Sequence, residues 1–318
     1  MNADLGKTLF TPEEIDDLRD RLKNYKDKHK LSWADLSTAT GIPQGTLSTW
    51  VPGGYNGGKI YENQSLPGFA YRFFLGMAER EALEAVLPAE PDFQMTISAR
   101  RMSNCLALAH MGDMALISSA PGSGKTATLI QYQATRPQVW LSTMSPSRRG
   151  VNTMLIAILA SMGERDAKGT PQALSDRVVA RVRGADALIV VDEAQHLSAQ
   201  AFDELRSIHD QTGCGVALVG DETLAAALKK YPQLYSRLGI RHSQPRPLNE
   251  DVAAVGRAWG VEKGPELAFL QDIGRRGGGL RTITKTLKLA IRAARAGGAP
   301  LDIADLKDAY AQRYGDQG

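Results

Sequence analysis

The sequence predicts an α/β protein with a parallel sheet flanked by helices, preceded by an all-α domain and followed by a small all-α domain. In the middle of the chain, short apolar runs alternate with longer helical stretches, which is typical of a parallel sheet. From about Asn249 onward the pattern is helical, without strand candidates. The segment Leu87-Pro88-Ala89-Glu90-Pro91-Asp92 holds two prolines, which block regular structure. We therefore expect three domains, at residues 1–88, 89–248 and 249–318.

Length and composition exclude several classes of protein. A chain of 318 residues is long enough for two or three domains with real cores. Hydrophobic residues at 43% and charged residues at 23% exclude wholesale disorder, and a net charge of +3 excludes a polybasic protein. The two cysteines, Cys105 and Cys214, exclude a four-cysteine zinc site and suit a reducing cytoplasm. No apolar run is long enough for a membrane span.

The N-terminal region reads as a series of helices. Thr11-Pro12-Glu13-Glu14 combines an N-cap, a proline at the first helical position and a capping box, so a helix should follow to about Lys30. A second cap begins at Ser32, Gly41 interrupts the pattern, and a short apolar-periodic stretch runs from Gln44 to Val51. An aromatic-rich helix is expected over about Ser65–Val86.

The two short helices around Gly41 fit a helix-turn-helix. With Gly41 as the turn residue, the apolar side chains of Leu36, Ile42, Leu47 and Trp50 fall at the buried positions of that motif. The polar side chains that would face outward toward DNA are those of Gln44, Thr46, Ser48 and Thr49. Candidate phosphate contacts are Lys23, Lys26, Lys28, Lys30 and Lys59. The alternative is a compact helix pair with a glycine turn that binds no DNA.

Four buried strands are predicted in the middle region, each separated from the next by at least one helix. The strands are expected at Met114–Ser118, Val139–Ser142, Ala187–Val191 and Val216–Val219. The helices are expected at Ala127–Tyr132, Gly150–Met162, Pro171–Arg183 and Ala199–Thr212.

A phosphate-binding loop directly follows the first strand and opens a helix. It spans residues 119–126 (SAPGSGKT), with Ser119 in place of the usual first glycine. Gly122 and Gly124 let successive N–H groups curl around a phosphate at the positive end of a helix dipole. Lys125 would place its charge between the β- and γ-phosphates, and the Thr126 hydroxyl would hold Mg²⁺. Nucleotide binding is therefore expected at Ala120, Pro121, Gly122, Ser123, Gly124, Lys125, Thr126 and Ala127.

The third strand ends in two acidic residues, Asp192 and Glu193. A buried parallel strand delivers them to the carboxyl edge of the sheet, where ligands of open α/β sheets bind. Asp192 can order Mg²⁺ there, and Glu193 can orient and activate an attacking water. In a chain that also carries a phosphate-binding loop, this acidic pair predicts a nucleotide hydrolase. His196 has no second His or Cys at ligand spacing and is expected to be a packing residue.

These motifs, in this order, resemble the AAA+ ATPases, which implies a P-loop AAA+ core, a C-terminal lid domain, and ATP and Mg²⁺ as cofactors. In that family a polar residue after the fourth strand acts as sensor 1; Asp221 stands at this position, with Glu222 or Thr223 as alternatives. Arg237 stands where the family places an arginine finger that acts in trans, and Arg241 is a competing candidate. Arg281, in Gly279-Leu280-Arg281, matches the start of a sensor 2 helix.

Positive charge gathers on one predicted helix. Between Arg275 and Arg295 there are seven basic residues and no acid, and five of them recur at steps of four and three, so they share a helical face. Such a stripe can bind the DNA backbone, although a solvated face is the alternative. The candidate DNA contacts outside the N-terminal domain are Lys285, Lys288, Arg292, Arg148 and Arg149.

The whole order of parts resembles the phage Mu transposition protein B group, from about Glu14 to Asp305. The matching landmarks are Gly45-Thr46-Leu47-Ser48, Tyr55-Asn56-Gly57, the loop of residues 121–126, Val191-Asp192-Glu193-Ala194-Gln195-His196-Leu197, Leu234-Tyr235-Ser236-Arg237 and Gly279-Leu280-Arg281.

This resemblance implies an ATPase that binds double-stranded DNA with little sequence preference and forms homo-oligomers on it, as a helical filament or ring. It would deliver target DNA to a transposase and stimulate strand transfer in the cytoplasm of a bacterial or phage-infected cell. Hydrolysis, slow and stimulated by DNA, would drive disassembly. Two alternatives stay open: a helicase loader or replication initiator, and a nucleotide-switched helix-turn-helix regulator that binds one operator.

Overall fold

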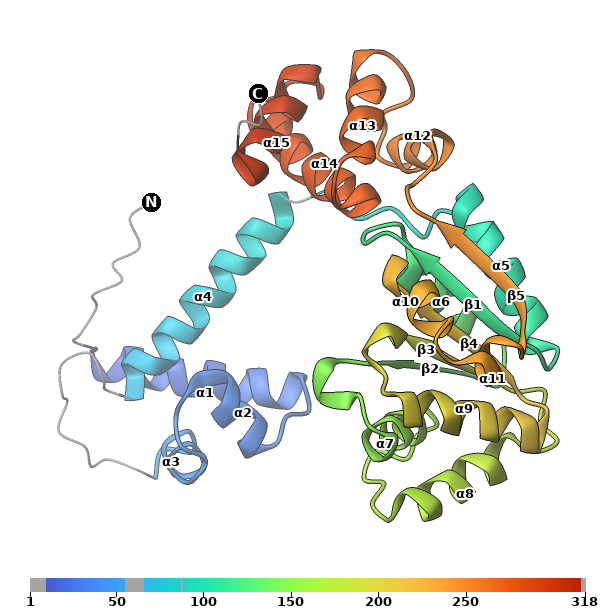
Figure 1. Ribbon diagram of the computed structural model, residues 1–318. Helices are drawn as coiled ribbons and strands as arrows, with labels where there is room; N and C mark the ends of the chain where they lie inside the picture. The colour runs from blue at the N-terminus through green and yellow to red at the C-terminus, as the bar shows by residue number, and fades with distance from the viewer. Residues whose placement is uncertain (1–9, 55–65, 87, 316–318) are drawn as a thin grey trace. The chain divides into compact units, whose positions relative to one another are not determined.

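The computed structural model describes residues 10–54, 66–86 and 88–315 (Figure 1). The chain forms two compact units, Met1–Pro88 and Ala89–Gly318. Lys59 and the landmark Tyr55-Asn56-Gly57 lie outside the described residues. Within the described ranges, no helix is both long and apolar enough to cross a membrane.

The first unit is helical. Thr11 caps its first helix, because the Thr11 hydroxyl accepts a hydrogen bond from the Glu14 N–H at 3.3 Å and the Glu14 carboxylate accepts one from the Thr11 N–H at 3.0 Å. This confirms the predicted capping box. The described helices are α1 (Pro12–Lys28), α2 (Trp33–Thr40), α3 (Gln44–Trp50) and α4 (Leu66–Val86).

The turn between α2 and α3 has the predicted burial pattern. Gly41 adopts a left-handed φ of 74°, which glycine reaches without steric cost. Leu36, Ile42, Leu47 and Trp50 are all buried in the core of this unit. The unit therefore holds a helix pair with a glycine turn, and DNA binding by this pair stays a prediction.

The second unit contains a parallel sheet of five strands in the order β2-β3-β4-β1-β5. Four of them confirm the predicted strands, and the fifth was missed. The strand β5 lies at the edge of the sheet and alternates buried with exposed residues, including Arg241, so it lacks the apolar run of a central strand. The strands are β1 (Met114–Ser119), β2 (Val139–Thr143), β3 (Leu188–Asp192), β4 (Gly215–Gly220) and β5 (Leu238–Gln244).

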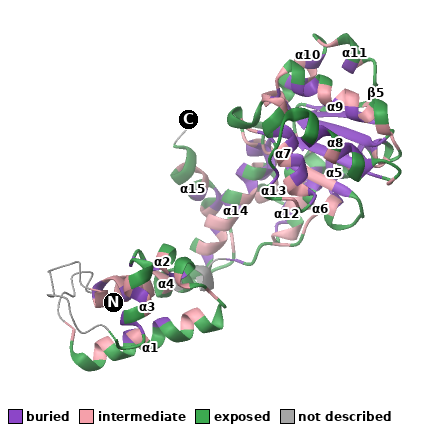
Figure 2. Cartoon of the chain, turned by 90° about the horizontal axis from the view of Figure 1, so that it is seen from below, coloured by how far each residue is buried: buried purple, intermediate pink, exposed green. Residues whose placement is uncertain are grey.

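Helices cover both faces of this sheet, so its central strands are buried throughout (Figure 2). Met114 and Leu116 of β1 belong to the core on one face, whereas Ala115 and Ile117 belong to the core on the other. One face is covered by α5 (Ile97–His110) and α6 (Lys125–Ala134). The other face is covered by α7 (Val151–Ser161), α8 (Pro171–Val182), α9 (Ala199–Thr212) and α10 (Glu222–Leu228).

Four helices follow the sheet and pack around a third core. The buried Asp251 carboxylate joins this helical part to the sheet part, since it accepts hydrogen bonds from the N–H groups of Ser98 and Leu248, both at 3.0 Å. The helices are α12 (Asn249–Ala258), α13 (Pro265–Arg275), α14 (Gly279–Ala296) and α15 (Ile303–Tyr314).

Candidate active site

The phosphate-binding loop leaves β1 after Ser119 and enters α6 at Lys125. Gly122 and Gly124 have φ values of 78° and 92°, a region that other residues reach only with strain. The Ser119 hydroxyl lies 2.6 Å from the Ser123 hydroxyl. The serine that replaces the usual first glycine therefore closes a hydrogen bond inside the loop.

Lys125 points back into this loop. Lys125 is only 8% exposed, and its Nζ donates hydrogen bonds to the carbonyl oxygens of Ser119 at 2.6 Å and Ala120 at 3.1 Å. Burial lowers the pKa of the Lys125 ammonium group, while the carboxylates of Glu193 and Asp192 oppose that shift. The lysine is thus an almost buried cation held by carbonyl dipoles that a phosphate could replace.

Asp192 lies at the end of β3, opposite the start of α6. The Thr126 hydroxyl donates to Asp192 Oδ2 at 3.0 Å, and the Glu193 N–H donates to Asp192 Oδ1 at 2.9 Å. Burial raises the pKa of the Asp192 carboxyl group, and these two hydrogen bonds oppose the rise. The residue is 1% exposed.

This oxygen pair fits Mg²⁺. A hydroxyl and a carboxylate in contact are the hard donors that Mg²⁺ takes beside substrate phosphates and waters, and such a site needs no all-protein cage. Within the part of the chain that the structure describes, no three His, Cys, Asp or Glu side chains cluster as a metal site.

Glu193 follows Asp192 and lines the same cavity as Lys125. Its φ of 55° is left-handed, an uncommon conformation for a non-glycine residue that marks a strained backbone. Gln195, in the short helix η2 (Ala194–His196), donates from Nε2 to Glu193 Oε2. This contact was not predicted, because nothing in the sequence distinguishes Gln195 from an ordinary polar residue.

Asp221 directly follows β4, which lies between β3, the strand before Glu193, and β1, the strand before the phosphate-binding loop. Its carboxylate caps α10 by accepting a hydrogen bond from the Thr223 N–H at 2.9 Å. Its own N–H donates to Gln195 Oε1 at 3.3 Å. Asp221 also lines the cavity, where the sensor 1 position was expected.

The start of α14 lies directly on the phosphate-binding loop. The Arg281 N–H donates to the Gly122 carbonyl oxygen at 3.3 Å, and a Cβ on Gly122 would lie 1.9 Å from the Gly278 carbonyl oxygen. Only glycine at position 122 therefore permits this approach. Arg281 lines the cavity, and its role as sensor 2 stays a prediction.

A cavity of about 550 Å³ joins these parts. Beyond the predicted loop, it is lined by residues that the sequence reasoning missed, among them Phe93, Val255 and Trp259. The helix α5 beside them could have been found from its Thr96 cap and the apolar spacing of Met102, Leu106 and Ala109.

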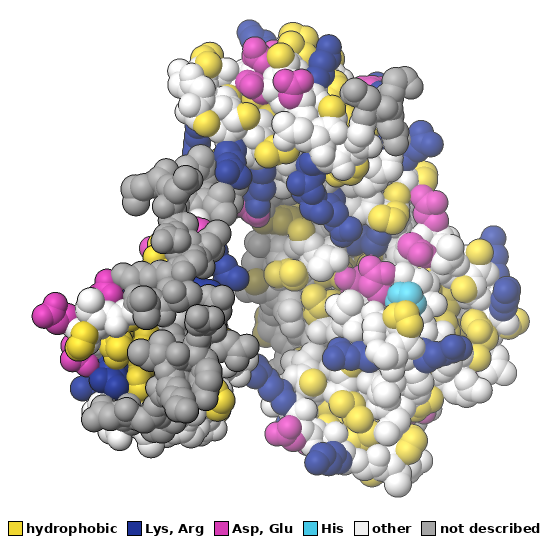
Figure 3. Space-filling model, turned by 90° about the vertical axis from the view of Figure 1, so that its left-hand side faces the viewer, with side chains coloured by type: hydrophobic (Ala, Val, Ile, Leu, Met, Phe, Trp, Pro, Cys, Tyr) yellow, Lys and Arg dark blue, Asp and Glu magenta, His cyan; other side chains and the backbone are white. Residues whose placement is uncertain are grey.

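The structure separates the predicted DNA contacts on α14. Lys285 and Lys288 line the nucleotide-sized cavity, and Lys288 forms an ion pair with Glu90. Arg292 is one turn further along and is not among the cavity residues. Figure 3 shows Lys and Arg side chains gathered along the lower border of the C-terminal helices.

The remaining predicted DNA contacts are not among the residues that line this cavity. Arg148 and Arg149 are exposed beside the short helix η1 (Pro146–Arg148), and the Arg149 carbonyl accepts a hydrogen bond from the Ser198 N–H at 2.9 Å. In α3, Gln44 and Thr49 are exposed, and Thr46 and Ser48 are half-buried.

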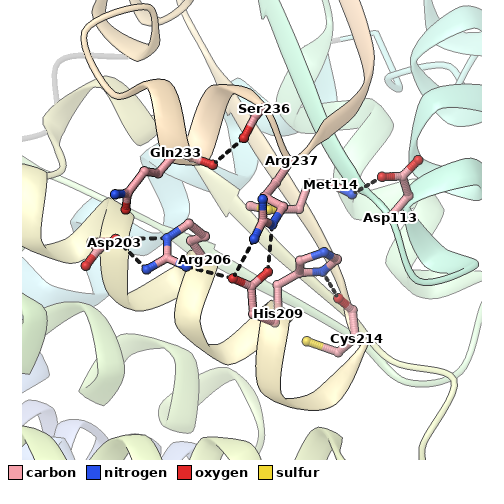
Figure 4. A network of polar contacts seen from close by, with 10 residues as sticks. Asp113, Met114, Asp203, Arg206, His209, Cys214, Gln233, Ser236 and Arg237 are labelled. Carbon is pink, nitrogen blue, oxygen red and sulfur yellow. Dashed lines mark hydrogen bonds and ion pairs between the residues drawn. The ribbon is translucent and has the colours of Figure 1, made fainter.

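Arg237 is not among the residues that line the cavity, and Figure 4 shows its side chain in a network of polar contacts. Its Nε donates to Asp210 Oδ1 at 3.0 Å, and Asp210 also pairs with Arg206. Its side chain is 47% exposed. The competing candidate, Arg241, lies over the Tyr235 ring at 3.9 Å.

We expect Asp192→Asn to raise the melting temperature of the nucleotide-free protein at neutral pH. The folded-state pKa of Asp192 lies above the unfolded value, so ionisation in the folded state costs stability. That cost is absent at a pH below the pKa of Asp192 in the unfolded chain, about 3.9, and complete above its pKa in the folded protein. The rise in melting temperature caused by Asp192→Asn should therefore shrink as the pH falls toward about 4. Each kcal/mol gained in the free energy of unfolding should raise the melting temperature by about 2–4 °C.

Differential scanning fluorimetry across this pH range checks the expectation. The matched control is Asp166→Asn, because Asp166 is exposed. A wild-type protein that is as stable as Asp192→Asn at pH 7.5 would contradict the expectation.

Comparisons with known proteins agree with this geometry. A family model for the AAA domain matches residues 110–228, and one for the C-terminal part of the Mu B transposition protein matches residues 236–312. Among solved structures, the Aeropyrum pernix ORC2 protein shares the fold, with a TM-score of 0.52 and 19% identity over 68% of this chain and 67% of that chain.

Two curated relatives cover nearly the whole chain. The Mu-like prophage FluMu DNA transposition protein B of Haemophilus influenzae is 31% identical over 278 residues, which are 85% of this chain and 94% of that protein. The ATP-dependent target DNA activator B of Escherichia phage Mu is 27% identical over 303 residues, 93% of this chain and 95% of that one. The chain therefore belongs to the Mu transposition protein B family and has a P-loop core of the AAA type.

Proposed function

We propose that this protein is an ATPase that assembles on double-stranded DNA, delivers target DNA to a transposase and stimulates strand transfer. The observation that carries the proposal is the convergence of Lys125, Glu193 and Arg281 on one cavity. The names of the relatives, a DNA transposition protein B and an ATP-dependent target DNA activator B, support the role in transposition.

The cavity suits a nucleoside triphosphate. Phosphates would replace the carbonyl oxygens of Ser119 and Ala120 as partners of Lys125, and the loop N–H groups would bind them at the start of α6. Phe93 and Trp259 offer aromatic surface for the base at the other end. Arg281 would contact the γ-phosphate from α14.

Hydrolysis depends on residues at the carboxyl ends of β3 and β4. Thr126 and Asp192 would hold Mg²⁺, which neutralises charge on the phosphates when bound. Glu193 orients a water and accepts its proton. Asp221 senses the γ-phosphate as sensor 1, with Glu222 or Thr223, whose hydroxyl donates to the Asp221 carboxylate, as alternatives. The rate would be slow in the free protein and increased by DNA.

Arg237 acts on the nucleotide of a neighbouring subunit in this proposal. Its distance from its own cavity and its exposure support a role in trans, and its ion pair with Asp210 would break on assembly. A partly exposed ion pair of this kind costs little to break, on the order of 1 kcal/mol or less. Hydrolysis would then depend on homo-oligomers and would lead to their disassembly.

DNA contacts would come from surfaces outside the cavity. Arg292, Arg148 and Arg149 carry positive charge on such surfaces, and an oligomer would repeat them along the phosphate backbone. The helix α3 has no charged residue, so any contact there would use the hydroxyl and amide groups of Gln44, Thr46, Ser48 and Thr49.

We expect Lys125→Ala to abolish ATP-dependent assembly on unrelated duplex DNA and to lower ATP hydrolysis by about 100-fold or more, since it removes the charge that binds the phosphates. Electron microscopy and phosphate release measure the two effects. Lys229→Ala, at an exposed lysine outside the cavity, is the control. If the wild-type protein gives operator-sized footprints on DNA and no oligomers, the helix-turn-helix regulator is favoured instead. If it loads a helicase and does not stimulate a transposase, the helicase loader is favoured.

Mixing two variants whose hydrolysis is strongly reduced tests the arginine finger. Glu193→Gln keeps Arg237, and Arg237→Ala keeps the hydrolytic residues, so an equal mixture should restore activity at about a quarter of the interfaces, one half times one half. Phosphate release in the presence of DNA measures the rescue. Arg241→Ala replaces Arg237→Ala in a parallel mixture. A mixture no more active than its parts would refute action in trans by Arg237.

We expect Arg292→Ala to weaken binding equally to all duplex sequences. Loss of one phosphate contact should reduce the slope of log K against log salt by about 0.9 per contact. Fluorescence anisotropy at several salt concentrations, with a non-hydrolysable ATP analogue, measures this slope. The control is Arg165→Ala, at an exposed arginine in the segment between α7 and α8. Equal slopes for Arg292→Ala and the wild type would exclude the contact.

A further inference from the structure

The amide of Gln195 joins two strand ends at the candidate active site. Its Nε2 donates to Glu193 Oε2, and its Oε1 accepts the Asp221 N–H at 3.3 Å. Glu193 follows β3 and Asp221 follows β4, and these strands are neighbours in the sheet. One side chain therefore connects the residue placed to activate water with the strand end placed to sense the nucleotide.

The chemistry of this position requires an amide. The Glu193 carboxylate needs a donor, and the Asp221 N–H needs an acceptor. Among side chains of this length, a glutamine supplies both at neutral pH, whereas an ionised glutamate supplies acceptors only. The two partners also determine which end of the amide faces Glu193.

The neighbouring backbone leaves room for this amide. A Cβ on Gly220 would lie 2.4 Å from Gln195 Oε1, so any larger residue at 220 would displace the side chain. Glu193 itself has a left-handed φ of 55°, and its N–H is bonded to Asp192. The Glu193 backbone is thus held on one side by Asp192 and its carboxylate on the other by Gln195.

We propose that Gln195 is a positioning residue for hydrolysis, which orients the Glu193 carboxylate and couples it to the end of β4. The inference rests on the ATPase function proposed above. Loss of the amide leaves the phosphate-binding loop intact, because Gln195 has no contact with Lys125 or Thr126 among the hydrogen bonds of the described residues. It therefore lowers kcat and not nucleotide affinity.

The first test is Gln195→Ala, with kcat and KM for ATP hydrolysis and the Kd of a fluorescent nucleotide as readouts. We expect kcat to fall about 10–100-fold, since a general base that is poorly oriented loses part of its contribution. The nucleotide Kd should stay within about twofold. Gln200→Ala, at an exposed glutamine near the start of α9, is the control. Wild-type kcat in Gln195→Ala, or a loss of affinity instead, would overturn the inference.

Two further variants separate positioning from a merely structural effect. In a Glu193→Gln background, Gln195→Ala should lower kcat no further, because the group that it orients is gone. The isosteric Gln195→Glu keeps the packing but loses the donor at neutral pH. Its kcat should be low at pH 8 and rise, relative to the wild type, as the introduced carboxyl group becomes protonated toward about pH 5.

The outcomes distinguish the inference from the function on which it rests. Two results would refute positioning by Gln195 but leave the proposed ATPase function supported. The first is a kcat of the double variant that is lower than that of Glu193→Gln by the full factor seen for Gln195→Ala alone. The second is a pH profile of kcat for Gln195→Glu that runs parallel to that of the wild type. Absence of hydrolysis in the wild-type protein with DNA and ATP would refute the proposed function, and the inference with it.

Discussion

The carboxylate of Asp192 is buried at the end of β3, where it accepts one hydrogen bond from Thr126 and one from the Glu193 N–H. A buried carboxylate is costly unless such partners satisfy it, and these two come from α6 and from the chain after β3. Their arrangement requires the phosphate-binding loop and the end of β3 to meet at the same edge of the sheet. The parallel order β2-β3-β4-β1-β5 provides this meeting point.

The C-terminal helices are joined to the same edge of the sheet by backbone contacts. Gly122 of the loop and Gly278 before α14 approach so closely that no Cβ fits, and the Arg281 N–H bonds to the Gly122 carbonyl. The carbonyl of Gln244, at the end of β5, accepts the Ala120 N–H at 3.4 Å, and the Gln244 side chain bonds to Ser98, a partner of the buried Asp251. Any displacement of the loop would therefore also shift the start of α14.

The helix α14 connects two roles that the sequence assigned separately. Arg281, Lys285 and Lys288 line the cavity, whereas Arg292 lies one turn beyond it on the same helix. A nucleotide and a DNA backbone would both attract this helix, since both are polyanions. The basic stripe, which in the sequence is one candidate DNA-binding surface, is thus divided by the position of α14 into residues that line the cavity and a residue beyond it.

The sequence by itself determined the α/β core, four of its strands, the loop of residues 119–126 and the acidic pair Asp192 and Glu193, because apolar runs and Gly-Lys-Thr spacing are local signals. The tertiary structure decided the rest. The edge strand β5 has no apolar run, and Phe93 and Trp259 enter the cavity from segments far apart in the chain. The contacts of Gln195 and Gly220 exist only because β3 and β4 lie side by side. Strand order and close backbone approach depend on packing between distant segments, which no local pattern records.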